Sequence, residues 1–445
     1  MRRVLLINPP IHDFAAYDFW AKPLGLMIVG SALKQAGFAV DFLDFVDPCS
    51  PWLPDKFRPK RKPGGHGKFH RLRLPRPDML PGIGRRFSRY GLPPVFAERA
   101  IKALPRPDAV LVTSMMTYWY TGVQEAIALA RQAFPGVPVI LGGVYAGLCT
   151  EHATAHSGAD HVLPGPIETQ LSPLFELIGA SAESIHEPFV PAYHLAPYAD
   201  SAAIMTSRGC PFRCLYCGVK ALAPEFVKHE PVRVVADVQA VAAQGVHDLA
   251  IYDDALLIDA DRAVEVLSRI AALCLPLRFH AASGLSLRGL SPKVAAAMKA
   301  AGFETVRLGL ETNNPNRQRE LGGKASCDEF DAAVENLLSA GFSRDRIGVY
   351  VLAALPGQSI DEIRGAVEFV LDRKLRPHLS EYSPVPKSPM FSVAQHESYY
   401  DLDEPLFHNP TLLPCAGPGV THETINRLKL DIRERTKRLE REQKI

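Results

Sequence analysis

The sequence predicts an α/β protein with three parts. Residues 1–180 are expected to form a doubly wound, Rossmann-like domain, residues 201–392 a partial (βα)6 barrel of the TIM type, and residues 393–445 a small C-terminal helical cap. Two observations lead to this expectation. Short apolar β runs alternate with helical patterns along most of the chain, and a linker at 181–200 that contains Pro and Ala separates the first domain from the second. The length of 445 residues suits two or three domains.

The first domain opens with a βαβ unit. A β run at 3–8 stops at Pro9-Pro10, a helical pattern at 24–36 ends at Gly37, and a second β run covers 38–45. The same alternation returns later and predicts strands at 109–113, 137–141 and 161–163 and helices at 122–133, 144–156 and 165–178. Because helices join consecutive strands, we expect a parallel sheet.

An insertion at 49–105 has a distinct composition. Between Lys56 and Arg89 there are twelve Lys and Arg residues and one acid, Asp78, although the whole chain carries a formal net charge of only +2. A solvated, partly disordered loop is one interpretation. The other is an anion-binding lid, in which the run Arg85-Arg86-Phe-Ser-Arg89-Tyr90 would suit a phosphate- or carboxylate-bearing ligand. Nucleic-acid binding has no fold motif to support it.

Six βα repeats follow the linker. Strands are predicted at 202–206, 249–252, 277–282, 305–310, 348–352 and 378–382, and helices at 232–244, 260–273, 292–301, 327–340 and 360–371. Six parallel strands make a barrel that is open on one side, and the chemistry of such barrels lies at the C-terminal ends of the strands. A charged helix at 421–442 closes the chain, with charges suited to i,i+4 pairing on a solvated surface.

Three cysteines lie on the loop that leaves the first of these strands. Cys210, Cys214 and Cys217 have the spacing C-x3-C-x2-C. Three thiolates on one tight loop can hold three irons of a [4Fe-4S] cluster, which normally has four cysteine ligands, so one iron would stay open to a ligand that is not protein. A zinc site or three unrelated buried cysteines are the alternatives, but zinc usually has four protein ligands, and no fourth Cys or His lies within ten residues after Cys217.

This motif resembles the radical S-adenosylmethionine (SAM) superfamily, including the aromatic residue before the third cysteine, Tyr216. The resemblance implies that the open iron binds SAM and that one electron from the cluster cleaves SAM to a 5′-deoxyadenosyl radical. It also implies a SAM pocket, with Tyr216 among its residues, and an electron donor such as a flavodoxin or a ferredoxin.

Acidic residues follow two of the later strands. Asp253 and Asp254 end the second strand, where the resemblance places polar residues near the methionine part of SAM, and capping of the next helix is the alternative role. Glu311 lies in Gly309-Leu-Glu311-Thr312, which resembles a G-L-E-S stretch of the family. Because an unpaired buried carboxylate is costly, we expect Glu311 to contact SAM or to form an ion pair with Arg307.

The last two strands of the barrel carry further resemblances. Leu355-Pro356-Gly357-Gln358 is similar to a P-G-E/Q turn, and Pro384–Pro389 is similar to a P-x-P-G-T-P stretch, with Lys387 where a glycine is common. Cys415 stands alone in the C-terminal part and is expected to be a plain residue rather than a ligand of a second cluster.

The first domain resembles the cobalamin-binding-like domain that precedes many radical SAM domains. The similar residues are Asn8-Pro9-Pro10, Pro23-Leu-Gly25, Gly142-Gly143 and Gly165-Pro-Ile-Glu168, and glycines at strand ends would let the backbone approach a nucleotide tail. The D-x-H-x-x-G signature of an axial histidine is absent, and His12 has the wrong spacing for that role. The sequence therefore names Gly142 and Gly143 as cofactor contacts and leaves cobalamin binding open.

These features predict a radical SAM enzyme that acts on a small molecule, which the basic insertion suggests is anionic. If the protein binds cobalamin, we expect it to methylate an unactivated carbon or phosphorus. If it does not, we expect a rearrangement, cyclisation or oxidation. The rival class is an anion- or nucleic-acid-binding protein in which the cysteines hold a structural metal. The sequence contains no run of 18 apolar residues, so we expect no membrane span. The five cysteines outside the motif are scattered singly and form no disulfide framework, so we expect the protein to lie in a reducing cytoplasm.

Overall fold

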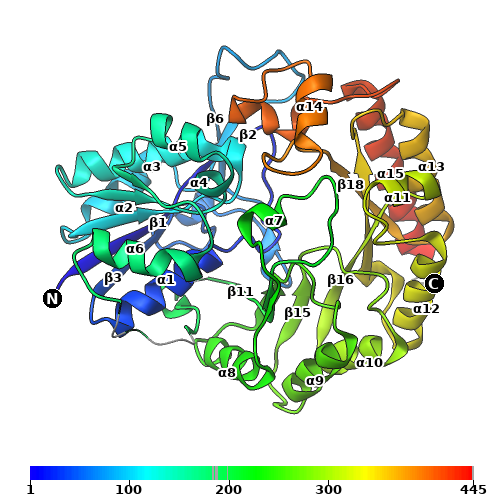
Figure 1. The fold of residues 1–445 in the computed structure, drawn as a ribbon, viewed down its shortest axis with the longest axis horizontal. Coiled ribbons are helices and arrows are strands. Elements are labelled where there is room, and N and C mark those ends of the chain that lie inside the picture. The colour runs from blue at the N-terminus through cyan, green and yellow to red at the C-terminus, as the bar shows by residue number, and fades with distance from the viewer. Residues whose placement is uncertain (183–184, 186–188, 198, 443–445) are drawn as a thin grey trace. The chain divides into compact units, whose positions relative to one another are not determined.

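The computed structural model describes residues 1–182, 185, 189–197 and 199–442. The chain divides into two compact units (Figure 1). Unit 1 contains Met1–Ile204, Ala221–Ala223 and Asp237–Asp248, and unit 2 contains Met205–Lys220, Pro224–Ala236 and Leu249–Ile445. No helix in these described ranges combines the length and the apolar character that crossing a membrane requires.

Unit 1 is built on a five-stranded parallel sheet. Its strands are β1 (Arg3–Asn8), β3 (Ala39–Asp44), β8 (Ala109–Val112), β9 (Val139–Leu141) and β10 (His161–Val162), in the order β10-β9-β8-β1-β3. The helices are α1 (Leu24–Gln35), α2 (Pro94–Lys102), α3 (Tyr120–Ala133), α4 (Val144–Leu148), α5 (Thr150–His156) and α6 (Ile167–Leu177). In Figure 1, α1 and α6 lie on one face of the sheet, and α2 and α3 lie on the other.

This arrangement explains the apolar strands. Residues Val4 to Ile7 of β1 are all at most 1% exposed, as expected for a strand that is covered on both faces. On one face, Val4 and Leu6 pack with Leu26 and Leu33 of α1 and with Phe175 of α6. The prediction of a doubly wound α/β domain is confirmed. The single helix expected at 144–156 is instead two helices, because the backbone leaves the helical region at Cys149.

The basic insertion is ordered, so its interpretation as a partly disordered loop is wrong. It forms a 3-10 turn η1 (Asp55–Phe57), the strands β4 (Arg61–Lys62), β5 (His66–Gly67), β6 (Arg71–Arg73) and β7 (Ser88–Tyr90), and α2. Strand β7 lies between β6 and β2 (Ile11–Asp13) in a small antiparallel sheet. Arg61 binds Asp18 and Asp200, which ties the insertion to the rest of unit 1.

The second sheet is the predicted partial barrel. Its strands are β11 (Ala202–Ile204), β14 (Asp248–Ile251), β15 (Arg278–Ala281), β16 (Phe303–Glu311), β17 (Ile347–Ala353) and β18 (Arg376–Glu381), in this order. The pairs β15–β16, β16–β17 and β17–β18 are parallel. The order begins at β11 and ends at β18, so the barrel is open.

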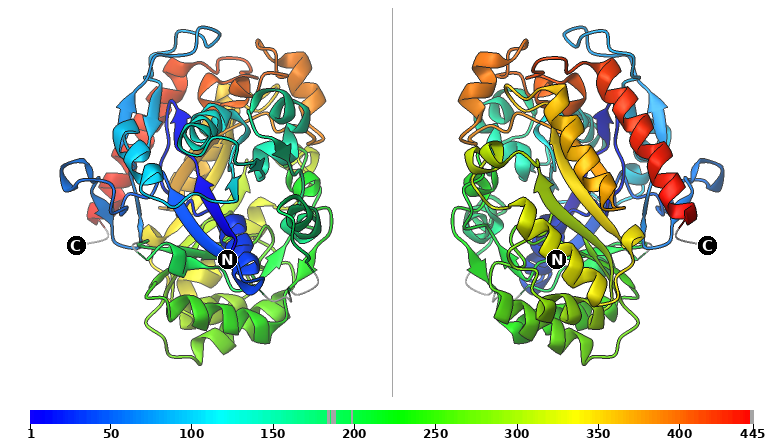
Figure 2. Two further views of the ribbon diagram at one scale, coloured as in Figure 1. Left: turned by 90° about the vertical axis from the view of Figure 1, so that its left-hand side faces the viewer. Right: turned by 90° about the vertical axis from the view of Figure 1, so that its right-hand side faces the viewer.

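Helices cover the outside of the barrel, as both views in Figure 2 and the ribbon in Figure 1 show. They are α8 (Pro231–Ala242), α9 (Ala260–Ala271), α10 (Pro292–Ala300), α12 (Cys327–Ser339) and α13 (Ile360–Asp372). All five lie within two or three residues of the predicted ranges. Short helices α7 (Val219–Leu222), α11 (Pro315–Glu320) and α14 (Phe391–Glu397) were not predicted.

The final helix, α15 (His422–Glu442), is not merely a solvated helix. Its side chains Ile425, Leu428 and Ile432 are buried. The helix packs against α13 and β18, and Arg435 pairs with Glu368 of α13 at 2.6 Å. The expected i,i+4 pairing occurs on its outer side, between Glu423 and Arg427 at 2.8 Å.

Candidate functional site

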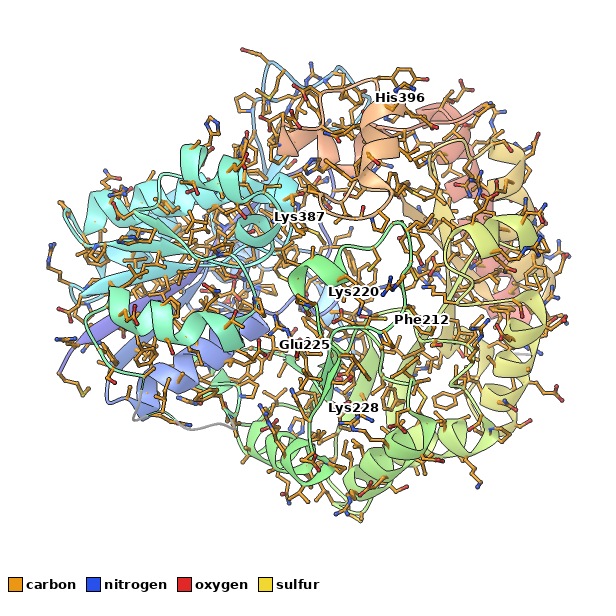
Figure 3. The ribbon with its side chains drawn as sticks, viewed as in Figure 1. Phe212, Lys220, Glu225, Lys228, Lys387 and His396 are labelled. Atoms are coloured by element: carbon orange, nitrogen blue, oxygen red, sulfur yellow. The ribbon has the colours of Figure 1, made fainter. Side chains whose placement is uncertain are left out.

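The three motif cysteines lie on the loop between β12 (Ser207–Arg208) and α7, all within unit 2. Phe212 in this loop and Lys220 in α7 mark the segment in Figure 3. The thiols of Cys210, Cys214 and Cys217 are partly buried and free, and all three line one cavity of about 90 Å³. The cavity wall also includes Tyr216, Asp253 and Asp254, two of which end β14.

Burial raises the pKa of all three thiols. The charge of Cys214 raises the pKa of Cys210 and Cys217 further, while Lys324 lowers the pKa of Cys210 and Cys214. Thiolates held this close together need nearby positive charge, which bound iron would supply.

The described residues contain no group of three or more His, Cys, Asp or Glu side chains arranged to hold a single metal ion. In a [4Fe-4S] cluster each cysteine binds a different iron, so the thiolates need not converge on one point. Three thiols that share a cavity without converging therefore fit a cluster.

Asp253 fastens the start of the cysteine loop to β14. Its carboxylate accepts hydrogen bonds from the backbone N–H and hydroxyl of Thr206 and from the hydroxyl of Ser207, each at 2.6 Å. Asp254 likewise accepts from the N–H of Gly209 at 3.0 Å. Burial raises the pKa of Asp253 to about 6, although these three hydrogen bonds oppose the shift. Asp253 thus orients the loop that carries the cysteines.

The alternative role of Asp253 and Asp254, capping the next helix, is wrong. Helix α9 begins at Ala260, and its N-cap is Asp259, whose side chain accepts a hydrogen bond from the N–H of Arg262.

Glu311 ends β16 in a strained conformation. Its φ of +67° lies in the left-handed region, which is costly for a residue with a Cβ atom, and the β16–β17 register shifts between Gly309 and Glu311. Its carboxylate binds Lys324 Nζ at 2.6 Å. The expected alternative partner, Arg307, makes no such pair, so that prediction is wrong.

Lys324 is the site residue that the sequence did not indicate. Burial would lower the pKa of its ammonium group, but the charges of Glu311, Cys214 and Cys217 raise it. Its Nζ atom lies 5.6 Å from the ring centre of Tyr216, close enough for a cation–π contact. The preceding Gly322 packs on the backbone of Cys214, where a Cβ atom would approach Cys214 Cα to 3.2 Å. Glu311, Lys324 and Tyr216 therefore meet beside the thiols.

Gly142 and Gly143 follow β9 in unit 1, and their surroundings differ. Gly143 has a φ of +87°, and a Cβ atom there would lie 2.5 Å from the carbonyl oxygen of Ser114, so the fold itself requires this glycine. At Gly142 a Cβ atom would meet only the Leu163 carbonyl oxygen, at 3.9 Å. Of these two glycines, only Gly142 would accept a Cβ atom without a close contact.

His12 is held by other side chains. It lies in β2, and its Nε2 and Nδ1 atoms contact Glu125 and Thr121 at 2.8 and 3.2 Å. Arg89 is 1% exposed and binds the same Glu125 carboxylate, so the proposed anion-binding lid loses one of its three arginines. The expectation that His12 is no cobalt ligand agrees with these contacts.

Lys387 and Cys415, two further residues that the sequence analysis singled out, have surroundings that explain their roles. Lys387 has a φ of +64°, a conformation that favours glycine, which explains why a glycine suits this position. Cys415 is 2% exposed and packs with Leu355, Tyr382 and Ala394, as expected for a plain core residue.

Residues 204–370, which include the cysteine loop and the four barrel strands β14 to β17, match the model of the radical SAM superfamily. Over these residues the chain is similar to the radical SAM superfamily. This match favours the iron–sulfur interpretation of the three cysteines over the zinc and unrelated-cysteine alternatives.

Curated relatives of this chain are distant. An uncharacterized methyltransferase of Pyrococcus horikoshii is 26% identical over 196 residues, which are 42% of each chain. A GTP 3′,8-cyclase of Pseudomonas entomophila is 26% identical over 192 residues, which are 42% of this chain and 53% of that protein. This chain thus aligns with about half the length of these relatives.

Among the solved structures that resemble most of this chain is a methyltransferase with cobalamin bound. The radical SAM methyltransferase TsrM from Kitasatospora setae, with cobalamin and a [4Fe-4S] cluster bound, gives a TM-score of 0.65. The match covers 89% of this chain and 78% of TsrM at 18% sequence identity. The chain therefore has the fold of a B12-binding-like domain followed by a radical SAM barrel.

Proposed function

We propose that this protein binds a [4Fe-4S] cluster through Cys210, Cys214 and Cys217 and cleaves SAM reductively. The observation that carries the proposal is the cavity of unit 2, which gathers the three thiols of a C-x3-C-x2-C loop at the C-terminal ends of barrel strands. When bound, the cluster supplies the electron that cleaves SAM and starts radical chemistry.

The surrounding residues hold and orient the two cofactors. Asp253 holds the cysteine loop in place through Thr206 and Ser207. Glu311 and Lys324 present one negative and one positive group beside the thiols, which suits the ammonium and carboxylate of an amino acid such as the methionine part of SAM. Tyr216 supplies an aromatic wall to the same cavity. Apolar residues Leu256 and Leu285 limit the access of water, which would protect a radical.

We further propose that the reaction is a cobalamin-dependent methylation of an unactivated carbon or phosphorus. Support comes from unit 1, because a B12-binding-like domain before the barrel is also the arrangement of TsrM, a methyltransferase with cobalamin bound. Gly142 leaves room for the cofactor at the end of β9. Since His12 is engaged by Glu125, the cofactor would be held without a histidine from this position.

A cobalamin-independent rearrangement, cyclisation or oxidation is the second candidate. The GTP 3′,8-cyclase relative favours it, but that similarity spans less than half of this chain. As partners we propose a small-molecule substrate and a flavodoxin or ferredoxin that delivers the electron. None of the eight cysteines, all of which lie in the described ranges, forms a disulfide, which fits a reducing cytoplasm.

The test is anaerobic reconstitution of the full chain with iron and sulfide, followed by incubation with SAM and dithionite. We expect the absorbance of a [4Fe-4S] cluster and formation of 5′-deoxyadenosine, and loss of both in the triple variant Cys210→Ala/Cys214→Ala/Cys217→Ala. Cys274→Ala is the matched control, because Cys274 is exposed and lies outside the cavity. A wild-type chain without cluster and without 5′-deoxyadenosine would refute the proposal.

The methylation proposal has its own test. The chain is reconstituted with hydroxocobalamin and passed over a desalting column, and retained cobalamin is read from its absorbance. We expect about one equivalent to be retained, and roughly tenfold less in Gly142→Leu, whose bulkier side chain would obstruct the cofactor at the end of β9. If the protein cleaves SAM but retains no cobalamin, the proposal of SAM cleavage is supported and the proposal of cobalamin-dependent methylation is refuted.

A further inference from the structure

Three strands of the barrel carry a basic cluster on their inner face. In β16, Val306, Leu308 and Leu310 are 0% exposed and face the covering helices, so Arg307 points to the other side. Tyr350 of β17 donates from Oη to the carbonyl oxygen of Ala282, just after β15, at 3.2 Å. Because β16 lies between β15 and β17, this bond must cross the inner, concave face. Arg307 and Tyr350 therefore line the interior of the barrel.

Arg307 makes no ion pair with any carboxylate in the described part of the chain. Its Nη1 atom donates to the carbonyl oxygen of Val306 at 3.1 Å, and the Tyr350 hydroxyl lies beside the guanidinium group. Burial lowers the pKa of Arg307, and the charge of Arg376 lowers it further. A guanidinium group that is largely removed from water is costly without an anion, so most proteins supply one.

His378 of β18 lies beside Arg307. Its Nε2 atom is buried and has no hydrogen-bond partner. Burial, together with the charges of Arg307 and Arg376, lowers the pKa of His378 to about 3, so the ring is neutral. Between the two residues, in β17, is Gly348. A Cβ atom there would lie 2.7 Å from both Arg307 Nη1 and His378 Nε2, so both nitrogens pack directly over this glycine.

The carboxylates of these three strands are already used. Glu304 pairs with Arg346 at 3.0 Å, Glu311 pairs with Lys324 at 2.6 Å, and Glu381 pairs with Lys429. The described protein thus offers Arg307 and His378 no carboxylate. An oxyanion from outside would satisfy both, because guanidinium N–H groups and the Nε2–H tautomer of histidine are donors.

We propose that Arg307 and His378 bind a carboxylate group of the substrate inside the barrel. The site lies on the barrel sheet below Glu311, at the level of Gly348, so an anchored carboxylate would hold the rest of the molecule toward the strand ends where the cysteine loop lies. The claim that the bound carboxylate belongs to the substrate rests on the proposed function. The claim that Arg307 and His378 bind a carboxylate rests only on the geometry of the three strands.

The experiment is a titration of the full chain with sodium acetate, followed by NMR of protein labelled with ¹⁵N-histidine. The His378 Nε2 resonance is assigned as the signal lost in His378→Gln. We expect it to shift in a saturable manner with acetate and not with sodium chloride at equal ionic strength. Arg307→Gln should weaken acetate binding roughly tenfold or more, since a charge-assisted hydrogen bond is lost.

Two further variants separate binding from folding. Gly348→Ala keeps both charges but places a methyl group where the two nitrogens meet, so it should also weaken acetate binding. Arg346→Gln is the matched control, because it removes an exposed guanidinium group that borders β17 and should leave acetate binding within twofold of wild type. Thermal unfolding monitored by circular dichroism confirms that each variant is folded.

The outcomes decide the proposal. A saturable shift that persists in Arg307→Gln and Gly348→Ala would overturn it, as would the lack of any saturable shift in wild type. Inorganic phosphate is run in parallel, and phosphate binding at least tenfold tighter than acetate binding would overturn the assignment to a carboxylate. The titration needs neither iron nor SAM, so its failure is distinguishable from a failure of SAM cleavage.

Discussion

At the scale of single residues, the site depends on charged groups that are partly buried and paired. Glu311 and Lys324 are 12% and 23% exposed, and they contact at 2.6 Å beside two of the thiols. Breaking such a pair leaves one charge without its partner in a poorly solvated place. The strained φ of Glu311 shows that the surrounding structure holds this carboxylate where an unstrained backbone would not.

The first prediction therefore concerns this pair. Glu311→Gln and Lys324→Met should each destabilise the protein by about 2 kcal/mol, while the double variant should be destabilised by less than the sum, with a coupling of about 1 kcal/mol. Urea unfolding of the four proteins gives these values. Glu304→Gln, which breaks an exposed pair at the other end of β16, should cost less than about 1 kcal/mol. Strictly additive effects would show that the two residues act separately.

At the scale of elements, Glu125 of α3 joins three segments. Its carboxylate binds Arg89 of β7 at 2.6 Å and His12 of β2 at 2.8 Å, so one side chain links two of the three strands of the small sheet to a helix of the Rossmann-like domain. Burial would raise the pKa of Glu125, but hydrogen bonds and charges from His12 and Arg89 lower it to about 2. The basic insertion thus gains order because its arginines find partners in unit 1.

The second prediction follows from this low pKa. Since the folded-state pKa lies below the ordinary value of 4.5, the ionised carboxylate contributes stability above that pH and loses it as the pH falls toward 2. Glu125→Gln should lower the free energy of unfolding by roughly 2–3 kcal/mol at pH 7, and the difference from wild type should shrink by pH 3.

Guanidinium chloride unfolding at pH 7, 4.5 and 3 measures this difference. Glu98→Gln is the control, because Glu98 is an exposed residue of α2 that pairs only with Lys102 one turn away. A difference that stays constant across the pH range would mean that the ion pairs contribute little.

At the scale of the whole molecule, the two units carry separate candidate cofactor sites. Unit 2 has the cysteine cavity, whose wall comes from the loop after β12, the end of β14 and the loop that contains Lys324. Unit 1 has the strand ends near Gly142. A ligand that binds only the native state stabilises the segments around it.

The third prediction uses this separation. In hydrogen exchange read by mass spectrometry, loading the cluster should slow exchange in peptides that cover 209–218 and 322–324, with no change at 113–114 and 142–143. Cobalamin should have the opposite pattern. If both cofactors slowed exchange in the same unit only, the assignment of one site to each unit would be wrong.

Most of the fold could be predicted from the sequence. Alternation of apolar β runs and helical patterns is a local property, and it placed the main strands and helices within a few residues, as for β1, β16 and α13. Local sequence patterns gave the wrong prediction where contacts with residues distant in sequence determine the structure. The basic insertion looked disordered because its charge pattern shows neither Glu125 nor Asp200, which are the partners of Arg89 and Arg61.

By itself the sequence determined the thiol spacing of Cys210, Cys214 and Cys217, since three ligands within eight residues need no tertiary contact to lie together. Only the tertiary structure decided what surrounds them. Asp253 meets Thr206 from 47 residues away, Lys324 rather than Arg307 meets Glu311, and Arg307 meets His378 across Gly348. These pairs form because parallel strands bring residues distant in sequence to one level of a barrel, and no local pattern records that register.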